Sequence, residues 1–261
     1  MNANHATYRL VPGLFVVAVL TMLSWVFSAP AHAVDPTSLE PAEVFTPKTL
    51  ELELETEYAK YEDAELEIEG TVGYAFSEKW KLKAALPVEN EEGDGTELGD
   101  VSLKVVHTFN PDTESWPLLG LSLELAFPTG DHGDDDSHGG IDTEVMLYAM
   151  QSLGGADSKH QLHLNLGGTF VGGASDDERD FRYSALLGYS YTLSERTTLV
   201  ADFVHEELEE SGEDSNMLEV GVKYQVNDSV EVAAGAGIGL GDDSPDFMVK
   251  AGVGFKAGGG K

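Results

Sequence analysis

The chain contains no cysteine, so neither a disulfide framework nor thiolate chemistry can support its fold or an activity. Basic residues are scarce: 15 Lys and Arg oppose 47 Asp and Glu, and the formal charge at pH 7 is −32. A chain this acidic lacks the basic surface that phosphate contacts require, and it attracts cations instead. We therefore expect no nucleic-acid partner.

Long apolar runs are missing after residue 33, which excludes a transmembrane helix from that part of the sequence. The one long run lies at the N-terminus, where Arg9 precedes LVPGLFVVAVLTMLSWVFSA and the small residues of AHA follow. This order indicates a cleaved secretory signal peptide at residues 1–33, although an uncleaved anchor is the competing interpretation. The chain is expected to be exported, and strands must cross any membrane that the rest of it spans.

The hydrophobic pattern has a period of two after residues 34–47, which contain three prolines and which we interpret as an extended periplasmic leader. LELELETEY (50–58) places leucines on one face and glutamates on the other, as only a strand does. Most such segments have about nine to eleven residues, the length that a tilted strand needs to cross a bilayer core. The predicted strands are residues 50–58, 64–76, 80–88, 101–109, 119–127, 142–152, 160–171, 181–191, 198–206, 217–226, 230–240 and 247–255.

The connections between these strands mostly alternate between short turns and longer acidic loops, and aromatic residues gather near strand ends. Outer-membrane barrels show both features. We predict an all-β fold, a single antiparallel transmembrane β-barrel of about 12 strands with up-and-down topology. It covers residues 48–256 and is followed by a glycine-rich tail at residues 257–261. A soluble β-sandwich, whose strands also alternate, is the other architecture considered.

Four stretches between about Leu98 and Phe255 resemble the outer-membrane barrel family labelled "meta-pathway of phenol degradation": ELGDVSLKVVHTF, LGLSLELAFPTGD, KHQLHLNLGGTFVG and VAAGAGIGLGDDSPDFMVKAGVGF. PTGD and GLGDDSPDF are the more specific parts. The resemblance implies a barrel in the outer membrane of a Gram-negative bacterium that passes small compounds, aromatic ones among them. It supplies no binding residues. KAGGGK follows Phe255, whereas the barrel assembly machinery commonly reads a terminal aromatic residue.

If the apolar faces meet lipid, the polar faces point into the lumen. The expected acidic lining residues are Glu51, Glu53, Glu55, Glu57, Glu65, Glu67, Glu69, Glu124 and Glu219, and the expected basic ones are Lys81, Lys83, Lys104, Arg182, Lys223 and Lys250. A lumen closed by ion pairs and a narrow cation-favouring passage both fit this set. The twelfth strand neighbours the first in a closed barrel, so we expect Lys250 to approach the early glutamates. We expect Lys81 and Lys83 to face the second strand across one turn.

The loop PTGDHGDDDSHGG offers oxygen and imidazole groups to a divalent ion. The candidate ligands are Asp131, His132, Asp134, Asp135, Asp136 and His138. Their spacing is not that of an EF-hand, so a solvated extracellular loop is the simpler interpretation. Weak binding of Ca²⁺ or Mg²⁺ is the alternative, and no other cofactor is expected.

An enzyme is not expected, and no catalytic residue is assigned, because the chain contains no G-x-S-x-G motif. Ser137, His138, His205 and Glu206 are the residue types that a hydrolytic barrel would use, and His163 faces the predicted lumen as a titratable group. The expected function is passive movement of small solutes through an acidic, cation-favouring lumen. The alternative is a closed structural or surface-interaction barrel whose acidic loops bind divalent cations. The expected partners are outer-membrane lipid, lipopolysaccharide, small solutes and the barrel assembly machinery.

Overall fold

The computed structural model describes residues 34–61, 63–91, 95–111, 117–130, 139–155, 158–175 and 178–259. Its strands are β1 (Thr49–Lys60), β2 (Ala64–Ser77), β3 (Trp80–Glu91), β4 (Gly95–Leu98), β5 (Val101–Thr108), β6 (Leu118–Phe127), β7 (Asp142–Ser152), β8 (His160–Phe170), β9 (Phe181–Ser194), β10 (Thr197–Glu207), β11 (Asp214–Asn227), β12 (Val230–Gly239) and β13 (Phe247–Gly258). Within those ranges no helix is long and apolar enough to cross a membrane. The predicted signal peptide and the candidate ligands at 131–138 lie outside the described residues.

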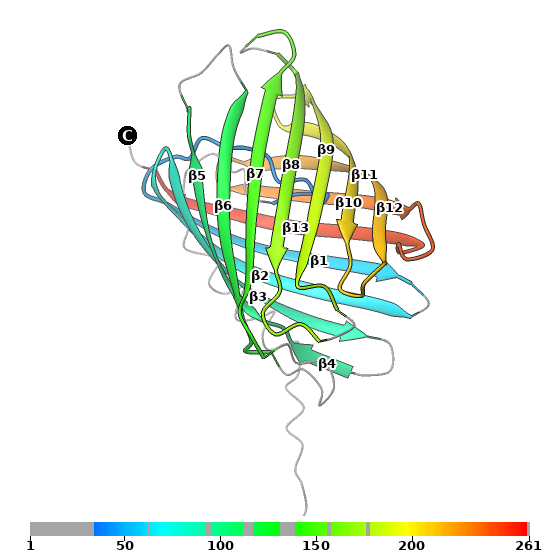
Figure 1. Ribbon diagram of the computed structural model, residues 1–261. Coiled ribbons are helices and arrows are strands. Elements are labelled where there is room, and N and C mark those ends of the chain that lie inside the picture. Colours follow the sequence, from blue (N-terminus) through cyan, green and yellow to red (C-terminus); the bar gives the residue numbers. More distant parts are fainter. Residues whose placement is uncertain are drawn as a thin grey trace, which may run out of the picture.

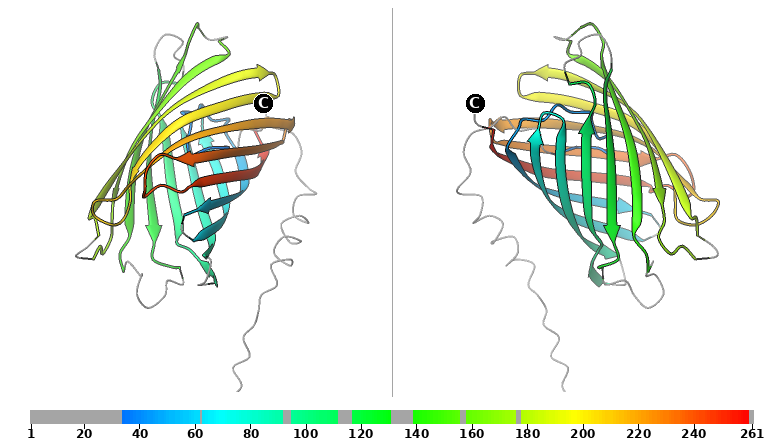
Figure 2. Two further views of the ribbon diagram at one scale, coloured as in Figure 1. Left: turned by 90° about the vertical axis from the view of Figure 1, so that its right-hand side faces the viewer. Right: turned by 60° about the vertical axis from the view of Figure 1, so that its left-hand side comes forward.

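The strands form a closed antiparallel barrel (Figures 1 and 2). Closure is made by β1 and β13, which pair along their whole length from Thr49↔Gly258 to Lys60↔Phe247. Twelve strands complete the barrel, and β4 is an extra short strand that extends β3 as a hairpin. The barrel prediction is therefore confirmed, and the sandwich alternative is wrong. The acidic stretch after residue 88, expected to be loop, forms the end of β3 and β4 instead.

The last strand continues beyond the predicted end at Phe255. Lys256 pairs with Glu51 in register, and Ala257 and Gly258 pair with the first residues of β1. The Lys256 ammonium lies 2.9 Å from a Glu51 carboxylate oxygen, with both side chains buried. Part of the expected glycine-rich tail is thus strand, because the alternation of inward and outward side chains carries on past the aromatic residue.

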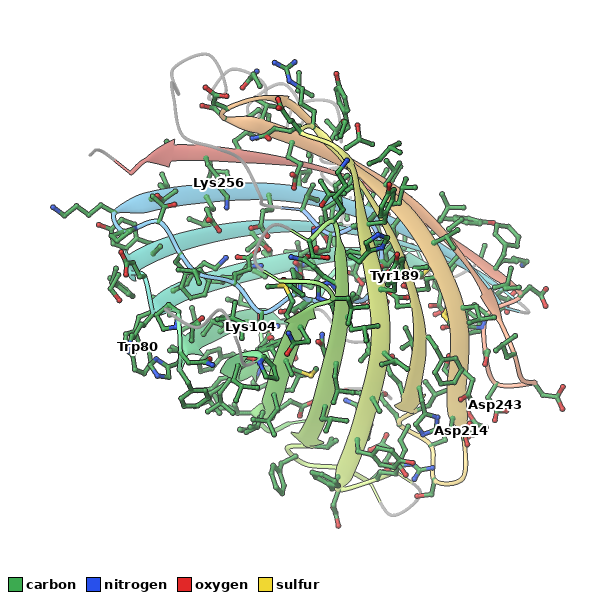
Figure 3. The ribbon with its side chains drawn as sticks, turned by 90° about the horizontal axis from the view of Figure 1, so that it is seen from above. Trp80, Lys104, Tyr189, Asp214, Asp243 and Lys256 are labelled. Atoms are coloured by element: carbon green, nitrogen blue, oxygen red, sulfur yellow. The ribbon has the colours of Figure 1, made fainter. Side chains whose placement is uncertain are left out.

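The outer face of the barrel is apolar. Leu187 and Val220 are 59% and 62% exposed, whereas the inward Tyr148 is only 3% exposed. Aromatic rings pack in pairs near the strand ends, as with Phe170 and Phe181, whose centroids are 5.0 Å apart. Figure 3 shows Trp80 at one rim and Asp214 with Asp243 far from it, at the end that carries the β10–β11 and β12–β13 loops. An apolar outside with aromatic ends suits a lipid environment.

Candidate functional site: a segment seated in the lumen

Residues 34–47, hereafter the inner segment, lie inside the barrel. Val34, Leu39 and Phe45 are each at most 5% exposed, and the contacts of the segment are with inward-facing residues of the strands. The sequence interpretation as a periplasmic leader is corrected here, since the segment occupies the lumen. The proline-rich inner segment forms no strand, but its apolar and charged side chains contact the inner wall of the barrel.

Two apolar clusters of the inner wall hold the inner segment. Leu39 packs in the first, among Leu186, Val200, Val204, Met217 and Met248. Ala42 packs in the second, among Leu118, Met146 and Tyr148, with Val106 and Met150 against them. Met146 and Tyr148 lie at inward positions of β7, where a polar face is expected for a strand that lines water. The structure explains this pattern, because these side chains face inward to cover the inner segment rather than to line water.

Inward-facing glycines bring the inner segment against the backbone of the wall. Pro36 lies over Gly221 and Gly235, which are partners on β11 and β12. Leu39 lies over Gly188 on β9, and Val34 over Gly252 on β13. A side chain at any of these glycines would collide with the segment. Glycine inside a strand commonly marks such a close approach, and here four strands share the device.

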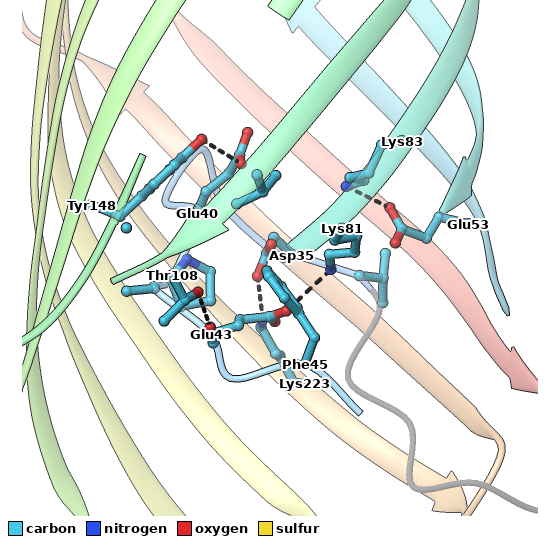
Figure 4. Close-up of a pocket in the computed structure, with 15 residues that line it drawn as sticks. Asp35, Glu40, Glu43, Phe45, Glu53, Lys81, Lys83, Thr108, Tyr148 and Lys223 are labelled. Carbon is cyan, nitrogen blue, oxygen red and sulfur yellow. Dashed lines mark hydrogen bonds and ion pairs between the residues drawn. The ribbon is translucent and has the colours of Figure 1, made fainter. Parts of the chain in front are cut away.

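Charged contacts also hold the inner segment, and each joins a carboxylate of the segment to a lysine of the wall. Figure 4 shows the pairs that Lys223 and Lys81 form. Asp35 pairs with Lys223, Glu40 with Lys104 at 2.8 Å, and Glu43 with Lys81 at 3.1 Å. Two hydroxyls add hydrogen bonds: Tyr148 Oη donates to Glu40 at 3.0 Å, and Thr108 Oγ1 donates to the Glu43 carbonyl at 2.5 Å. Ion pairs that are partly buried and also hydrogen-bonded favour one arrangement of the chain.

Ionisation of the inner segment follows from these pairs. Burial raises the pKa of Glu40, but the charges of Lys104 and Lys83 outweigh burial and hold the pKa at about 2. Burial likewise raises the pKa of Glu43, and Lys81 with Lys256 lowers it to about 2. For Asp35 burial dominates and the pKa is raised, although Lys223 opposes the shift. Glu40 and Glu43 are therefore seated as anions.

Acid is expected to release the inner segment. Because the pKa values of Glu40 and Glu43 are lowered when the inner segment is bound in the lumen, their ionisation stabilises the bound segment. This stabilisation is complete above the ordinary pKa of 4.5 and is lost as the pH falls toward 2. Asp35 works in the opposite direction and offsets part of the effect. Cleavage of folded protein by the acid protease pepsin within residues 34–47 should rise across this window, relative to a free peptide of the same sequence. If the folded protein and the free peptide are cleaved at the same rate at every pH, the inner segment is not held inside the barrel.

The wall has its own ion pairs, which connect most of the residues expected to line the lumen. They are Glu51 with Lys81, Glu53 with Lys83, Glu57 with Lys250 and Glu124 with Lys104, at 2.9 to 3.0 Å. The expected approach of Lys250 to the first strand is confirmed. The expectation that Lys81 and Lys83 face the second strand is confirmed, since they lie opposite Ala75 and Gly73 of β2. They reach across β2 to β1, because Gly73 between them carries no side chain to intervene.

Acidic residues concentrate on β1, β2 and β3 toward the β1–β2 turn. Glu55 stands opposite Glu69, and Glu57 opposite Glu67, which is in turn opposite Glu89. Lys250 ends this last row beside Glu57. Like charges that face each other across strands are destabilising unless water or cations intervene. We call Glu55, Glu57, Glu65, Glu67, Glu69, Glu89 and Glu91 the acidic patch.

The remaining predicted residues lie apart from the acidic patch. Arg182 pairs with Glu209 at 3.0 Å near the loops, and Glu219 accepts two hydrogen bonds from Ser38 of the inner segment. His163 bonds Ser190 at 2.9 Å inside the barrel. His205 contacts Asn216 and Tyr183, and neither bond gives it a serine nucleophile.

Free space beside the inner segment is small. A cavity of about 40 Å³ lies between the segment and the wall near Lys81, Lys83 and Tyr148 (Figure 4). This volume holds about one to three water molecules. At this place, between the segment and the wall, little room is left for a solute.

Several residues of this site were missed by sequence reasoning, namely Asp35, Glu40, Glu43, Tyr148 and Lys256. One usable signal was present. The leader carries three acidic residues at irregular spacing, and β5 carries Lys104 with no glutamate on the same strand. Period-two reasoning places residues on faces, but it assigns no position to a segment without regular structure.

A closed antiparallel barrel with an apolar outside and a polar, partly filled inside is the architecture of outer-membrane β-barrel proteins. Residues 35–257 match the family described as "Putative MetA-pathway of phenol degradation", and the chain belongs to that family, as the resemblance predicted. No curated protein matches.

Solved structures show the same fold. The COG4313 outer membrane channel from Pseudomonas putida F1 is 16% identical with a TM-score of 0.68, over 85% of this chain and 99% of that one. The KdgM porin is 10% identical with a TM-score of 0.56, over 78% and 98%. The NanC porin is 9% identical with a TM-score of 0.56, over 79% and 98%. At these identities the likeness concerns the fold.

Proposed function

We propose that this protein is a channel for small solutes in the outer membrane of a Gram-negative bacterium, and that the inner segment controls passage through it. The observation that carries the proposal is a segment outside the strand ladder that lies inside the closed barrel and is held there mainly by side-chain contacts. The family and the channel and porin neighbours support this class of function and suggest no enzyme. Small aromatic compounds remain the proposed solutes, on the family description alone.

We further propose that the passage favours cations at the end that holds the acidic patch. A ring or row of carboxylates attracts cations and repels anions when low-dielectric walls focus its field. Glu67 and Glu69 are better tests of this idea than Glu53, because Glu53 already forms a 3.0 Å pair with Lys83. Substitution of a paired glutamate breaks one ion pair, whereas substitution of glutamates in the acidic patch weakens the electrostatic field that attracts cations.

Selectivity measurements in a planar bilayer test the proposal. Substitution of both Glu67→Gln and Glu69→Gln should lower the cation-to-anion permeability ratio by about twofold or more, since two of the charges that attract cations are lost. The reversal potential under a salt gradient measures the ratio. Glu195→Gln, in the exposed β9–β10 turn at the other end, is the matched charge control and should leave it unchanged. An unchanged ratio in the double variant would remove the acidic patch as the filter.

A further inference from the structure

Two carboxyl groups meet beside the inner segment. Asp202 on β10 and Glu219 on β11 are partners in the strand register, and both side chains face the lumen, where the residues are 4% and 1% exposed. The two carboxyls are hydrogen-bonded to each other. A carboxylate has no proton to donate, so a hydrogen bond between two carboxyls requires that one of them holds a proton. Asp202 and Glu219 therefore form an acid pair.

Both members of the acid pair hold the inner segment. Glu219 accepts two hydrogen bonds from Ser38, at 2.6 Å from the backbone nitrogen and at 3.0 Å from the hydroxyl. Thr37 is hydrogen-bonded to Asp202. The two donors of Ser38 favour the ionised form of Glu219, so the proton belongs to Asp202 and is donated to Glu219. Because consecutive residues of the segment contact the pair, its charge acts directly on the segment.

One ammonium group serves several carboxyls around the acid pair. Lys250 on β13 acts on both members of the pair, but it already forms an ion pair with Glu57 at 2.9 Å and donates to the Ser38 hydroxyl at 3.1 Å. Glu206, which follows on β10, also faces Lys250 and repels Glu219. The single charge of Lys250 is therefore too little to hold every one of these groups as an anion in contact with the next.

The adjacent strands bring no charge directly opposite the acid pair. The register partners on β9 and β12 are Gly188 and Gly237, which have no side chain. His163 on β8 continues the same row beyond Gly188, and its ring nitrogen is engaged with Ser190 at 2.9 Å. Contact between the two carboxyls thus depends on the proton that they share.

We propose that Asp202 and Glu219 share one proton while the inner segment is bound, and that loss of this proton releases the segment from the lumen. At higher pH both carboxyls ionise, and two like charges in contact repel each other. Their separation breaks the hydrogen bonds to the segment, so the bound state loses stability as the pH rises and the proton leaves. Acid acts on Glu40 and Glu43 and base acts on the pair, so the segment is held most firmly between these two limits.

Thiol labelling measures release of the segment, because the chain has no cysteine of its own. Ala42→Cys places one thiol at a position of the inner segment that is 5% exposed, where maleimide reaches it only after release. Full-length A42C protein in detergent is labelled between pH 6 and pH 9, and each rate is divided by that of a free peptide of residues 34–47 with the same cysteine. This ratio removes the effect of pH on the thiol, and it should rise about tenfold or more.

Substitutions locate the group that responds to pH. In A42C with Asp202→Asn the ratio should stay low across the range, because the amide keeps a donor toward Glu219 and does not ionise. Asp214→Asn on A42C makes the same change at an exposed position of β11 and should keep the full rise. Heat-modified electrophoretic mobility confirms that each barrel is folded. If the Asp202 variant fails to fold, Glu219→Gln carries the test, since it removes the other ionising group.

Infrared spectroscopy detects the proton itself. At pH 6 the C=O stretch of protonated carboxylic acids should be stronger in the unaltered protein than in the Asp202→Asn variant, by the intensity of one carboxyl group per chain. The difference should disappear on titration to pH 9, since the pair then loses its proton. This signal does not depend on whether the segment is bound.

Three outcomes would overturn the inference. A labelling ratio of A42C that stays flat from pH 6 to pH 9 means that the acid pair does not release the segment. A rise that persists in the Asp202 variant assigns the response to another group. An infrared band that Asp202→Asn leaves unchanged means that the pair holds no proton. Neither readout requires conduction, so these results leave the proposed channel function standing, and a silent bilayer would not affect them.

Discussion

Replacing residues 36–43 with a glycine-serine linker of equal length is expected to raise the single-channel conductance about threefold or more, because side chains that fill the lumen are removed. The linker keeps the chain length and the start of β1, but it has neither Leu39 and Ala42 for the apolar clusters nor Glu40 and Glu43 for the lysines. Glycine-serine sequences behave as flexible coils, so the replacement has no preferred seat. Conductance steps in a planar bilayer measure the effect.

The same experiment separates the channel from the closed-barrel alternative. Val44→Ser, at a position of the inner segment that is 47% exposed, is the control and should conduct like the unaltered protein. If the linker variant inserts yet stays silent, side chains of the wall close the barrel without help from the segment, and the structural alternative is favoured. If its conductance equals that of the unaltered protein, solutes pass around the segment and the control role is wrong.

Gly235→Val is expected to displace the inner segment without unfolding the barrel. The valine side chain would point inward and collide with the backbone of Pro36, whereas valine is itself favourable in a strand. Maleimide labelling of Ala42→Cys should therefore become about tenfold faster, which corresponds to a loss of roughly 1.4 kcal/mol of seating free energy. Conductance should change in the same direction as in the linker variant.

Gly70→Val is the matched control for this substitution. Gly70 lies within β2, and a side chain added there meets nothing within 4 Å. The control thus carries the same propensity change without the collision, and its labelling rate should stay that of A42C alone. Equal acceleration in both variants would mean that valine disturbs the barrel generally, and the glycine contacts would lose their assigned role.

Much of this fold follows from local pattern. LELELETEY alternates so strictly that Leu50 had to face outward and Glu51 inward once one face met lipid, and the structure leaves Leu50 39% exposed and Glu51 3% exposed. The pairing of β13 with β1 followed from closure of an up-and-down sheet, and with it the contact of Lys250 with Glu57. These properties depend on period and neighbour order, which a sequence displays directly.

The partners inside the lumen did not follow from pattern. Lys81 and Lys83 select glutamates two strands away because Gly73 leaves a gap, and this depends on barrel curvature and side-chain length together. Ser38 of the inner segment donates two hydrogen bonds to Glu219 on β11, across a sequence separation that no local rule covers.

The sequence by itself determined a twelve-stranded barrel with an apolar outside and charged residues inside, because strand periodicity is a local property of the chain. Only the tertiary structure decided what fills the lumen. The inner segment has no period of its own, and its position results from many weak constraints that meet at one place: glycines that leave room, two apolar clusters, and lysines that need carboxylates. Such complementarity exists only once distant strands have been brought together, so the function proposed here depends on that closure.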